Sequence, residues 1–282
     1  MTRAAAFFDL DKTVIAKSST LAFGRPFFNG GLMNRRAVLK TAYAQLVFSR
    51  AGADAQQMER LRAQLTSMVT GWDAGVVQDI VSETLHEIVD PLVYAEAADL
   101  IEEHRAAGRE IVIVSSSGAE MVEPIGEMLG VDQVVATRMV TEAGRYTGEI
   151  EFYVYGENKA EALRRVAAEG GYDLADCYAY SDSVTDLPML AAVGHPTAVN
   201  PDRGLRRAAL ERGWPVLQFT RPVSMRTRFS APPAPVVTGA AVGVGAAVVG
   251  LAWYARHRAL RAGLVALDEP GPLSGRRRRR GA

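Results

Sequence analysis

The chain has 282 residues, of which 48% are hydrophobic and 23% are charged, and its formal net charge is zero. This composition is typical of a globular protein, and the lack of an overall positive charge argues against nucleic acid as a partner. The single cysteine, Cys177, excludes an internal disulfide framework and is typical of a protein from a reducing compartment.

The first feature along the chain is an apolar run, residues 4–8, that leads directly into two aspartates, Asp9 and Asp11. The run predicts a buried strand that ends in a turn. Both carboxylates would then lie at the carboxyl end of a strand, which is where ligands bind in open α/β sheets. Two carboxylates there indicate either a metal or phosphate site, or an ordinary turn, in which aspartate is common.

A long helical region follows the two aspartates. It shows no β alternation and is divided by glycines and by Pro91. Ser19 or Thr20 is placed to cap its first helix. The expected helices cover residues 21–28, 33–50, 55–70 and 75–88. About seventy residues of helix between two strands predict an inserted helical module, residues 17–91, and not a simple crossover.

Strand and helix patterns alternate from residue 92 to residue 220. Ser117 with Glu120, and Asn158 with Glu161, have the spacing of a helix capping box. The expected strands are residues 110–114, 134–137, 178–180, 197–200 and 216–219, with a hairpin over 138–151. The expected helices are residues 94–107, 117–129, 158–169, 187–193 and 202–212. The alternation predicts an α/β fold with a doubly wound parallel sheet, built from residues 1–16 and 92–220.

The composition changes after residue 220. A linker rich in proline and arginine, residues 221–235, precedes nineteen uncharged residues, 236–254. This length is close to the roughly twenty residues that a membrane-spanning helix needs, and Trp253 and Tyr254 suit a membrane interface. A buried or interfacial helix is the alternative. The basic tail, residues 255–282, is expected to be disordered.

The N-terminal residues and the apolar segment near the C-terminus together predict where in the cell the protein is found. Residues 1–4 are too short and too weakly apolar for a signal peptide. We therefore expect a cell-membrane protein with a single span and a cytoplasmic catalytic domain. Arginines flank the apolar segment on both sides, so its topology stays open.

Polar side chains occur at four places that a packed core would not favour: Asp9 with Asp11, Ser115, Lys159, and Asp182 with Asp186. Each alone has an ordinary explanation as a turn, a cap or a solvated lysine. Together they are consistent with a phosphate site. Carboxylates hold a divalent cation, a lysine neutralises charge, and a hydroxyl at a helix N-terminus donates to phosphate oxygens. One aspartate can attack phosphorus while a second moves the proton.

These residues also resemble the motifs of a known family. Asp9-Leu10-Asp11-Lys12-Thr13 resembles the first motif, DxDx[TV], of the haloacid dehalogenase-like (HAD) hydrolases. Ser115 matches their second motif, Lys159 their third, and Asp182 with Asp186 their fourth. The resemblance covers residues 5–220 and is strongest to the phosphoserine-phosphatase-like branch, subfamily IB. The helical insertion is similar to the C1 cap of that branch.

The resemblance implies a HAD-type Rossmannoid core and a Mg²⁺-dependent phosphomonoester phosphatase that acts on a small phosphorylated metabolite. Asp9 would be the nucleophile and Asp11 the general acid and base, and Asp11 would reach the metal only through its carbonyl. The implied site residues are Asp9, Asp11 and Lys159 for catalysis, Asp9, Asp11 and Asp182 for Mg²⁺, Ser115, Ser116 and Lys159 for the substrate phosphate, and Asp186 as a support behind them.

Two departures from the branch argue against phosphoserine itself as the substrate. Residues 17–20 hold no acid where phosphoserine phosphatases carry one for the substrate ammonium, and Ser116-Ser117 replaces glycines in the second motif. Candidate substrate contacts in the cap are Phe23, Arg25, Phe27, Phe28, Arg35 and Arg36, although the aromatic residues are more typical of cap core.

Parts of the same pattern also occur in other classes of protein. Asp11-Lys12-Thr13 also begins a P-type ATPase motif, but Val14-Ile15 breaks it and the chain lacks a bundle of membrane helices. A phosphotransferase or mutase that uses the same aspartyl-phosphate stays open, as does a membrane-tethered scaffold with a vestigial site.

Overall fold

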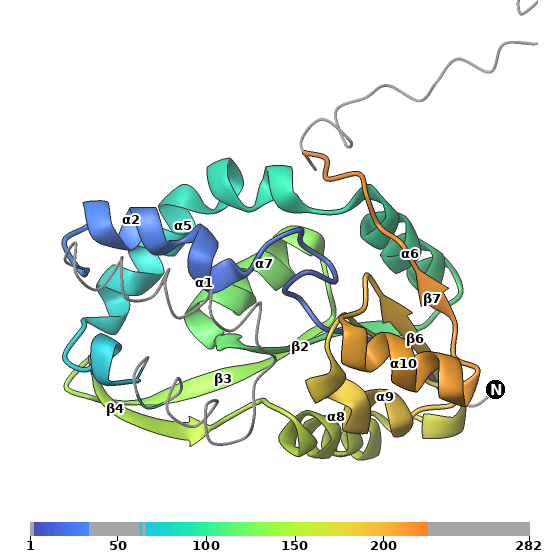
Figure 1. Cartoon of the computed structure of the whole chain (residues 1–282). Helices are drawn as coiled ribbons and strands as arrows, with labels where there is room; N and C mark the ends of the chain where they lie inside the picture. The colour runs from blue at the N-terminus through green and yellow to red at the C-terminus, as the bar shows by residue number, and fades with distance from the viewer. Residues whose placement is uncertain (1–2, 34–62, 64–65, 225–282) are drawn as a thin grey trace, which may run out of the picture. The chain divides into compact units, whose positions relative to one another are not determined.

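The computed structural model in Figure 1 describes residues 3–33, 63 and 66–224. Its centre is a seven-stranded sheet in the order β4-β3-β2-β1-β5-β6-β7, in which all neighbours are parallel except the β3–β4 hairpin. The strands are β1 (Ala5–Phe8), β2 (Glu110–Gly118), β3 (Gln133–Glu142), β4 (Arg145–Phe152), β5 (Tyr178–Ser181), β6 (His195–Val199) and β7 (Val216–Leu217).

Helices cover both faces of the sheet. Along the central strand β1, Ala6 and Phe8 pack into one hydrophobic layer with α6 (Ala95–Ala106) and α7 (Ala119–Leu129). Ala5 and Phe7 pack into the other layer, because successive strand side chains point to opposite faces. That second layer holds α8 (Glu157–Gly170), α9 (Leu187–Ala191) and α10 (Arg203–Arg212). The prediction of a doubly wound α/β fold is confirmed.

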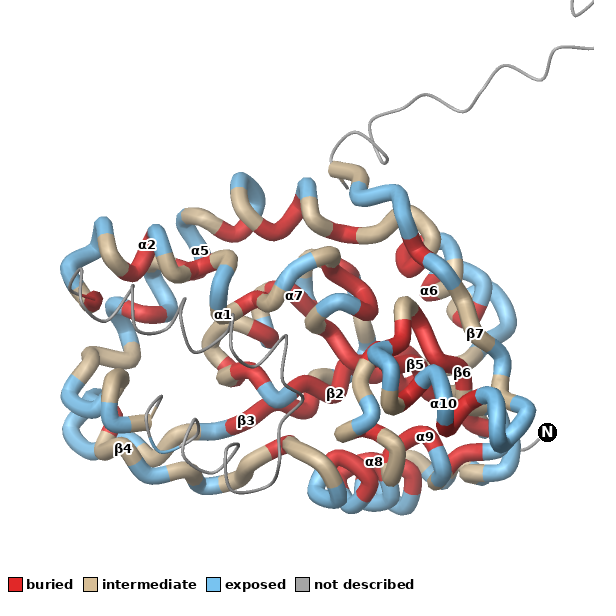
Figure 2. Tube along the Cα trace, viewed as in Figure 1, coloured by how far each residue is buried: buried red, intermediate tan, exposed pale blue. Residues whose placement is uncertain are grey.

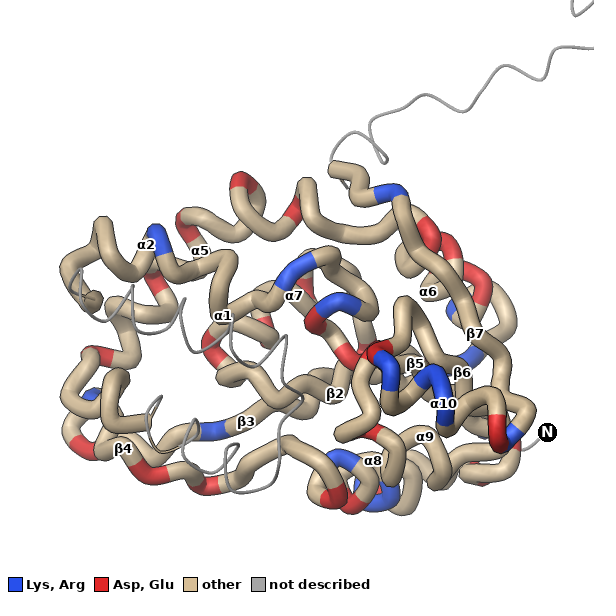
Figure 3. The backbone as a smooth tube through the Cα atoms, viewed as in Figure 1, with Lys and Arg blue, Asp and Glu red and all other residues tan. Residues whose placement is uncertain are grey.

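Burial follows these layers in Figure 2, where the central strands β1, β2 and β5 are largely buried and the outer helix faces are exposed. Acidic and basic residues are mixed along the described elements, as expected for a chain with no net charge (Figure 3). The described residues also form three short 3₁₀ helices, which are η1 (Asp90–Leu92), η2 (Leu174–Asp176) and η3 (Val184–Asp186).

The described part of the helical insertion consists of α1 (Ser19–Ala22), α2 (Gly24–Asn29) and α5 (Ala74–Ile88). The expected helix 75–88 is confirmed, and Asp73 caps it by accepting from the backbone N–H groups of Gly75 and Val76. The expected helix 21–28 is divided into α1 and α2. The expected helix 33–50 and most of 55–70 lie outside the described residues.

Backbone pairing ties the insertion to its surroundings. Gly71 N donates to Tyr146 O at 2.8 Å and Ala74 N donates to Gly144 O at 2.9 Å, so the segment before α5 runs along the β3–β4 hairpin. At the other end, the two segments that connect insertion and core pair with each other through Ile15 and Val93. Residues 221–223 join this pairing, and Val223 N donates to Val93 O at 2.8 Å.

Several local predictions are wrong. The N-cap of α7 is Gly118, without a side-chain cap, because the Ser117 hydroxyl bonds to Asp11. The N-cap of α8 is Gly156, and the Asn158 amide donates to the carbonyl of Tyr153. Neither Ser19 nor Thr20 caps α1, whose N-cap is Ser18. Residues 134–141 form one strand, β3, where we expected two.

The chain divides into two units, residues 1–230 and 231–282. Among residues 3–33, 63 and 66–224, no helix has both the length and the apolar character needed to cross a bilayer. The expected span, residues 236–254, lies outside these residues, so it stays a prediction.

Candidate active site

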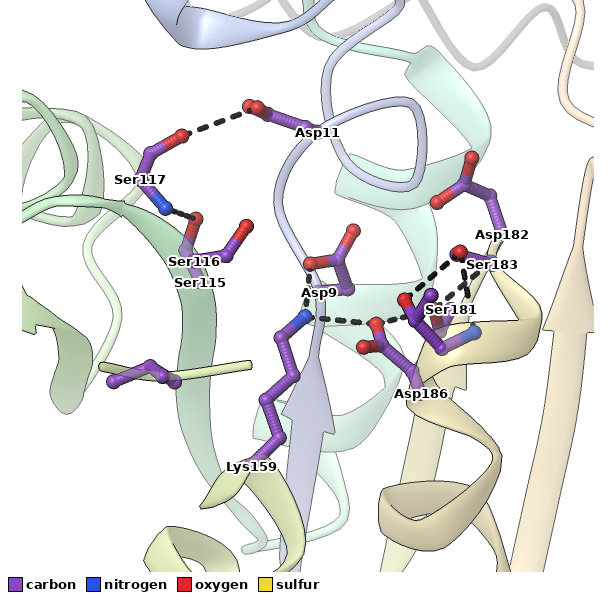
Figure 4. A network of polar contacts seen from close by, with 12 residues as sticks. Asp9, Asp11, Ser115, Ser116, Ser117, Lys159, Ser181, Asp182, Ser183 and Asp186 are labelled. Carbon is purple, nitrogen blue, oxygen red and sulfur yellow. Dashed lines mark hydrogen bonds and ion pairs between the residues drawn. The ribbon is translucent and has the colours of Figure 1, made fainter. Parts of the chain in front are cut away.

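The carboxyl ends of three adjacent strands and the first turn of one helix meet at a single edge of the sheet (Figure 4). Asp9 directly follows β1, and Asp182 directly follows β5. Ser115 lies near the end of β2, and Lys159 is the third residue of α8. Parallel strands share this edge, so residues distant in the sequence come together where α/β sheets bind ligands.

Lys159 is the centre of a buried ionic network. Its Nζ donates to Asp9 Oδ1 at 2.5 Å and to Asp186 Oδ2 at 2.7 Å, and only 2% of the residue is exposed. Burial alone would lower the pKa of Lys159, but the carboxylates of Asp186 and Asp9 outweigh burial and raise it. The lysine is therefore a permanent cation that holds Asp9 in place.

Asp9 and Asp182 are neighbouring carboxylates, and the pKa of each is raised by burial against the opposing charge of a lysine. Burial, opposed by Lys159 and reinforced by Asp186, raises the pKa of Asp9 to about 7. Burial and then the charge of Asp9 raise the pKa of Asp182 to about 8. The nearest other cation, the exposed Lys12, lies 3.9 Å from Asp182 Oδ2. Among the described residues Lys159 pairs with Asp9 and not with Asp182, so Asp182 has no buried cation of its own.

The donor set suits a hard divalent cation. Mg²⁺ is usually bound through one or two carboxylates together with water and phosphate oxygens. Within the described ranges, no three His, Cys, Asp or Glu side chains converge into a ready-made metal site. Asp9 and Asp182 can supply two carboxylate ligands. The carboxylate of the third predicted ligand, Asp11, is engaged by Ser19 and Ser117, which leaves its backbone carbonyl as the predicted ligand atom. The residues fit Mg²⁺ with two carboxylates and further oxygen ligands.

Asp11 points away from Asp9 (Figure 4). Its carboxylate accepts from the backbone N–H of Ser19 at 2.8 Å and from the Ser117 hydroxyl at 3.2 Å. A tight turn produces this orientation, with Lys12 in the left-handed region at φ 62° and Val14 N bonded to Leu10 O at 2.9 Å. Burial raises the pKa of Asp11 against these hydrogen bonds, which favours a group that carries a proton.

The serines of the second motif occupy different places. Ser115 is buried, and its hydroxyl accepts from the backbone N–H of Ser117 at 3.2 Å. Ser116 is exposed and lines the cavity described next. The pairing of β2 with β3 jumps from Ser115 to Gly118, so Ser116 and Ser117 form a bulge that faces Asp11.

A cavity of about 610 Å³ opens from this edge toward the helical insertion. Asp9, Asp11, Lys159, Asp182 and Asp186 line one part of it. Of the predicted cap contacts, Arg25, Phe27 and Phe28 also line it, whereas Phe23 is buried core and is not among its lining residues. Arg35 and Arg36 lie outside the described residues.

The sequence interpretation missed two residues that orient the site. The Ser117 hydroxyl donates to Asp11, and the Ser181 hydroxyl donates to Asp186 Oδ2 at 2.7 Å. Both serines flank predicted site residues, but serine next to a turn is too common to indicate a role. The only signal was the clustering of hydroxyl residues beside the acids.

Comparison with known proteins identifies the class. Residues 6–191 match the haloacid dehalogenase-like hydrolase family, and the chain belongs to this family. An inhibition of morphological differentiation protein from Streptomyces azureus is 63% identical over 261 residues, which cover 91% of this chain and 94% of that one. A probable phosphatase from Mycobacterium tuberculosis is 61% identical over 257 residues, covering 91% and 90%. A phosphoserine phosphatase from the same organism is 32% identical over 247 residues, covering 87% and 80%.

Solved structures agree with this assignment. A protein of unknown function from Bordetella pertussis has a TM-score of 0.67 and 29% identity, over 77% of this chain and 99% of that chain. A substrate-bound phosphoserine phosphatase has a TM-score of 0.58 at 18% identity, over 82% of this chain and 100% of that chain, which supports the fold. The protein is a HAD hydrolase with phosphatase relatives.

Proposed function

We propose that the protein is a Mg²⁺-dependent phosphatase that hydrolyses a small phosphomonoester through an aspartyl-phosphate formed on Asp9. The observation that carries the proposal is the buried Asp9 carboxylate, which Lys159 holds at the edge of the cavity beside Asp182. A nucleophile held by a buried cation, next to a second carboxylate whose only described ion-pair partner is the exposed Lys12, suits attack on a phosphate dianion.

The first half of the reaction transfers the phosphoryl group to the protein. Lys159 engages Oδ1 of Asp9, and Oδ2 attacks phosphorus as the bond to the leaving oxygen breaks. Asp11 gives its proton to that oxygen, so the alcohol departs neutral. Ser115, Ser116 and the N-terminus of α7 donate to the phosphoryl oxygens. Mg²⁺ bound by Asp9, Asp182 and the Asp11 carbonyl would supply positive charge to the phosphoryl group.

The second half restores the enzyme. Asp11, now a carboxylate, takes a proton from water while the water oxygen attacks phosphorus. The bond between phosphorus and Asp9 breaks, and inorganic phosphate and the Asp9 carboxylate are regenerated. Ser19 and Ser117 hold the Asp11 carboxylate in one orientation through both halves.

The test is hydrolysis of p-nitrophenyl phosphate with Mg²⁺ or with EDTA. Asp9→Asn should lower kcat by at least about 10⁴-fold, because it removes the attacking group. Asp79→Asn, an exposed residue of α5, makes the same chemical change away from the site and should keep the full rate. An Asp9→Asn protein that hydrolyses the ester at the wild-type rate would refute the proposal.

Membrane tethering of a cytoplasmic catalytic domain through residues 236–254 is part of the proposal. Its support is the nineteen-residue uncharged run and the arginines that follow it. The full chain should stay with the membrane fraction through carbonate extraction, and a chain that ends at residue 230 should not. Release of the full chain at high pH would show that the segment does not span.

A further inference from the structure

The cavity contains one acid outside the catalytic set. Among its described lining residues, Glu120 is the only acidic residue besides the four catalytic aspartates. Glu120 is the second residue of α7, and no ion pair joins it to another described residue. Arg25 also lines the cavity, but it is exposed and forms no ion pair with Glu120. Among the described residues, Glu120 is therefore a cavity carboxylate without an ion-pair partner.

The Glu120 carboxylate lies next to Gly118, the last residue of β2 and the N-cap of α7. Its Oε2 is 3.2 Å from the position that a Cβ on Gly118 would occupy. Gly118 follows Ser116 and Ser117 directly, so Glu120 adjoins the part of the site proposed to hold phosphate. A carboxylate repels phosphate, which makes the leaving group of the substrate the suitable partner for it.

A second, independent observation marks the same place. Tyr146 of β4 lines the cavity, is only 4% exposed, and its hydroxyl has no hydrogen-bond partner among the described residues. Burial, and after it the nearby Glu120 carboxylate, raises the pKa of this hydroxyl, although no well-formed hydrogen bond joins the two groups. A buried hydroxyl without a partner is uncommon and unfavourable unless a ligand completes it.

The surroundings of these two groups are apolar. Trp72, Met121, Met139 and Ile150 line the same cavity. A carboxylate in apolar surroundings is stabilised by a cation, and a neighbouring phenol oxygen can accept a second hydrogen bond from that cation. Glu120 also has a structural explanation, because an acid in the first turn of α7 stabilises the helix dipole. That explanation does not account for the unsatisfied Tyr146 hydroxyl.

Resting on the proposed phosphatase activity, we infer that the substrate carries one amine-type cation on an apolar body, and that Glu120 and Tyr146 bind this cation. The contact comes from α7 and the β3–β4 hairpin and not from α1 or α2 of the insertion. The pair determines specificity and takes no part in phosphoryl transfer.

The test compares three aryl phosphates that differ only at the far end of the leaving group. They are 4-(2-aminoethyl)phenyl phosphate, its neutral isostere 4-propylphenyl phosphate, and the anionic 4-(2-carboxyethyl)phenyl phosphate. The wild-type protein should favour the amine over the propyl ester by about tenfold or more in kcat/KM, the range for a hydrogen bond to a charged group. The carboxylate ester should be the poorest substrate.

Variants separate recognition from folding and chemistry. E120Q should lose the preference for the amine, improve the carboxylate ester, and hydrolyse the propyl ester at a near wild-type rate. Y146F should reduce the preference by a smaller factor, about threefold, because it removes one neutral acceptor. E127Q is the matched control, because Glu127 is exposed on the same helix and does not line the cavity. It should keep the wild-type preference.

The outcomes are distinguishable. If the wild-type protein hydrolyses all three esters equally, or if E120Q lowers all three together, the inference is overturned and the phosphatase stands. If the wild-type protein hydrolyses none of the esters and no p-nitrophenyl phosphate, the proposed function fails and the inference fails with it.

Discussion

Two buried polar networks lie on opposite faces of β5, and they differ in how their charges are balanced. Consecutive residues of the strand belong to different networks. The Ser181 hydroxyl bonds to Asp186 in the ionic network of Lys159, and the Tyr180 hydroxyl bonds to His104 Nε2 at 2.8 Å on the other face. The two networks share a strand and similar burial, so the difference between them lies in their chemistry.

The His104 network joins two neutral buried side chains, His104 and Tyr180, and its one cation, Arg109, is only half-buried. Arg109 Nε donates to His104 Nδ1 at 2.7 Å, so Nδ1 is the acceptor and Nε2 carries the proton that is donated to Tyr180. Burial, followed by the charge of Arg109, lowers the pKa of His104 to about 4. His195 stacks on Tyr178 with ring centroids 4.4 Å apart. Both ring nitrogens of His104 have a hydrogen-bond partner, and the arrangement suits a structural role.

The Lys159 network is charged and incomplete. Its carboxylates outnumber the buried cation, and the pKa values of Asp9 and Asp182 are raised. A fold tolerates such an imbalance where a ligand or a reaction makes use of it. The comparison teaches that burial alone does not mark a functional site, whereas unbalanced charge beside a cavity does.

The largest expected effect comes from removing the cation of the ionic network. Lys159→Met should lower the free energy of unfolding by about 3–5 kcal/mol, because it leaves Asp9 and Asp186 buried without their partner. Hydrolysis of p-nitrophenyl phosphate should fall to background. Urea denaturation measures the first effect. Lys12→Met, an exposed lysine, should change stability by less than about 0.5 kcal/mol. Equal effects of the two substitutions would show that Lys159 does not balance the buried carboxylates of Asp9 and Asp186.

Metal binding should give the next largest effect. Mg²⁺ at a hundredfold excess over its Kd should stabilise the wild-type protein by about 2.7 kcal/mol, since only the folded state presents the paired carboxylates. Asp182→Asn should abolish most of this stabilisation and raise stability in EDTA, because it removes one of two like charges. Thermal unfolding with Mg²⁺ and with EDTA measures both changes. A response to Mg²⁺ that Asp182→Asn leaves intact would place the ion elsewhere.

The smallest expected effect concerns the neutral network and pH. Burial lowers the pKa of His104 from 6.5 to about 4. Between pH 6.5 and pH 4, the unfolded chain therefore binds a proton at this residue that the folded chain does not bind. Stability from this residue is complete above pH 6.5 and falls as the pH is lowered toward 4. The loss should be at most about 1.4 kcal/mol for each pH unit between these values.

Urea denaturation across this pH range measures that loss. His104→Gln should have a shallower dependence on pH than the wild-type protein, whatever its overall stability. His86→Gln, an exposed histidine on α5, should match the wild-type slope. Parallel slopes for the wild-type protein and His104→Gln would show that His104 titrates normally in the folded state.

The sequence predicted the fold well where the physical signal was strong. The apolar runs that form β1, β2 and β5, followed at once by polar residues, predicted both the parallel sheet and the meeting of Asp9, Ser115 and Asp182 at one edge. Side-chain caps were predicted poorly. Ser117, Asn158 and Ser19 had suitable local spacing, but stronger tertiary partners or different helix boundaries took precedence.

By itself, the sequence determined the class of fold and the residue types of the reaction, because burial patterns and the demands of phosphate chemistry are local. Only the tertiary structure decided which charges are balanced. It turned Asp11 toward Ser19 and Ser117 while Lys159 reached Asp9, and it brought Glu120 of α7 beside Tyr146 of β4. Such pairings join residues that no sequence period relates, because they depend on how separate elements pack.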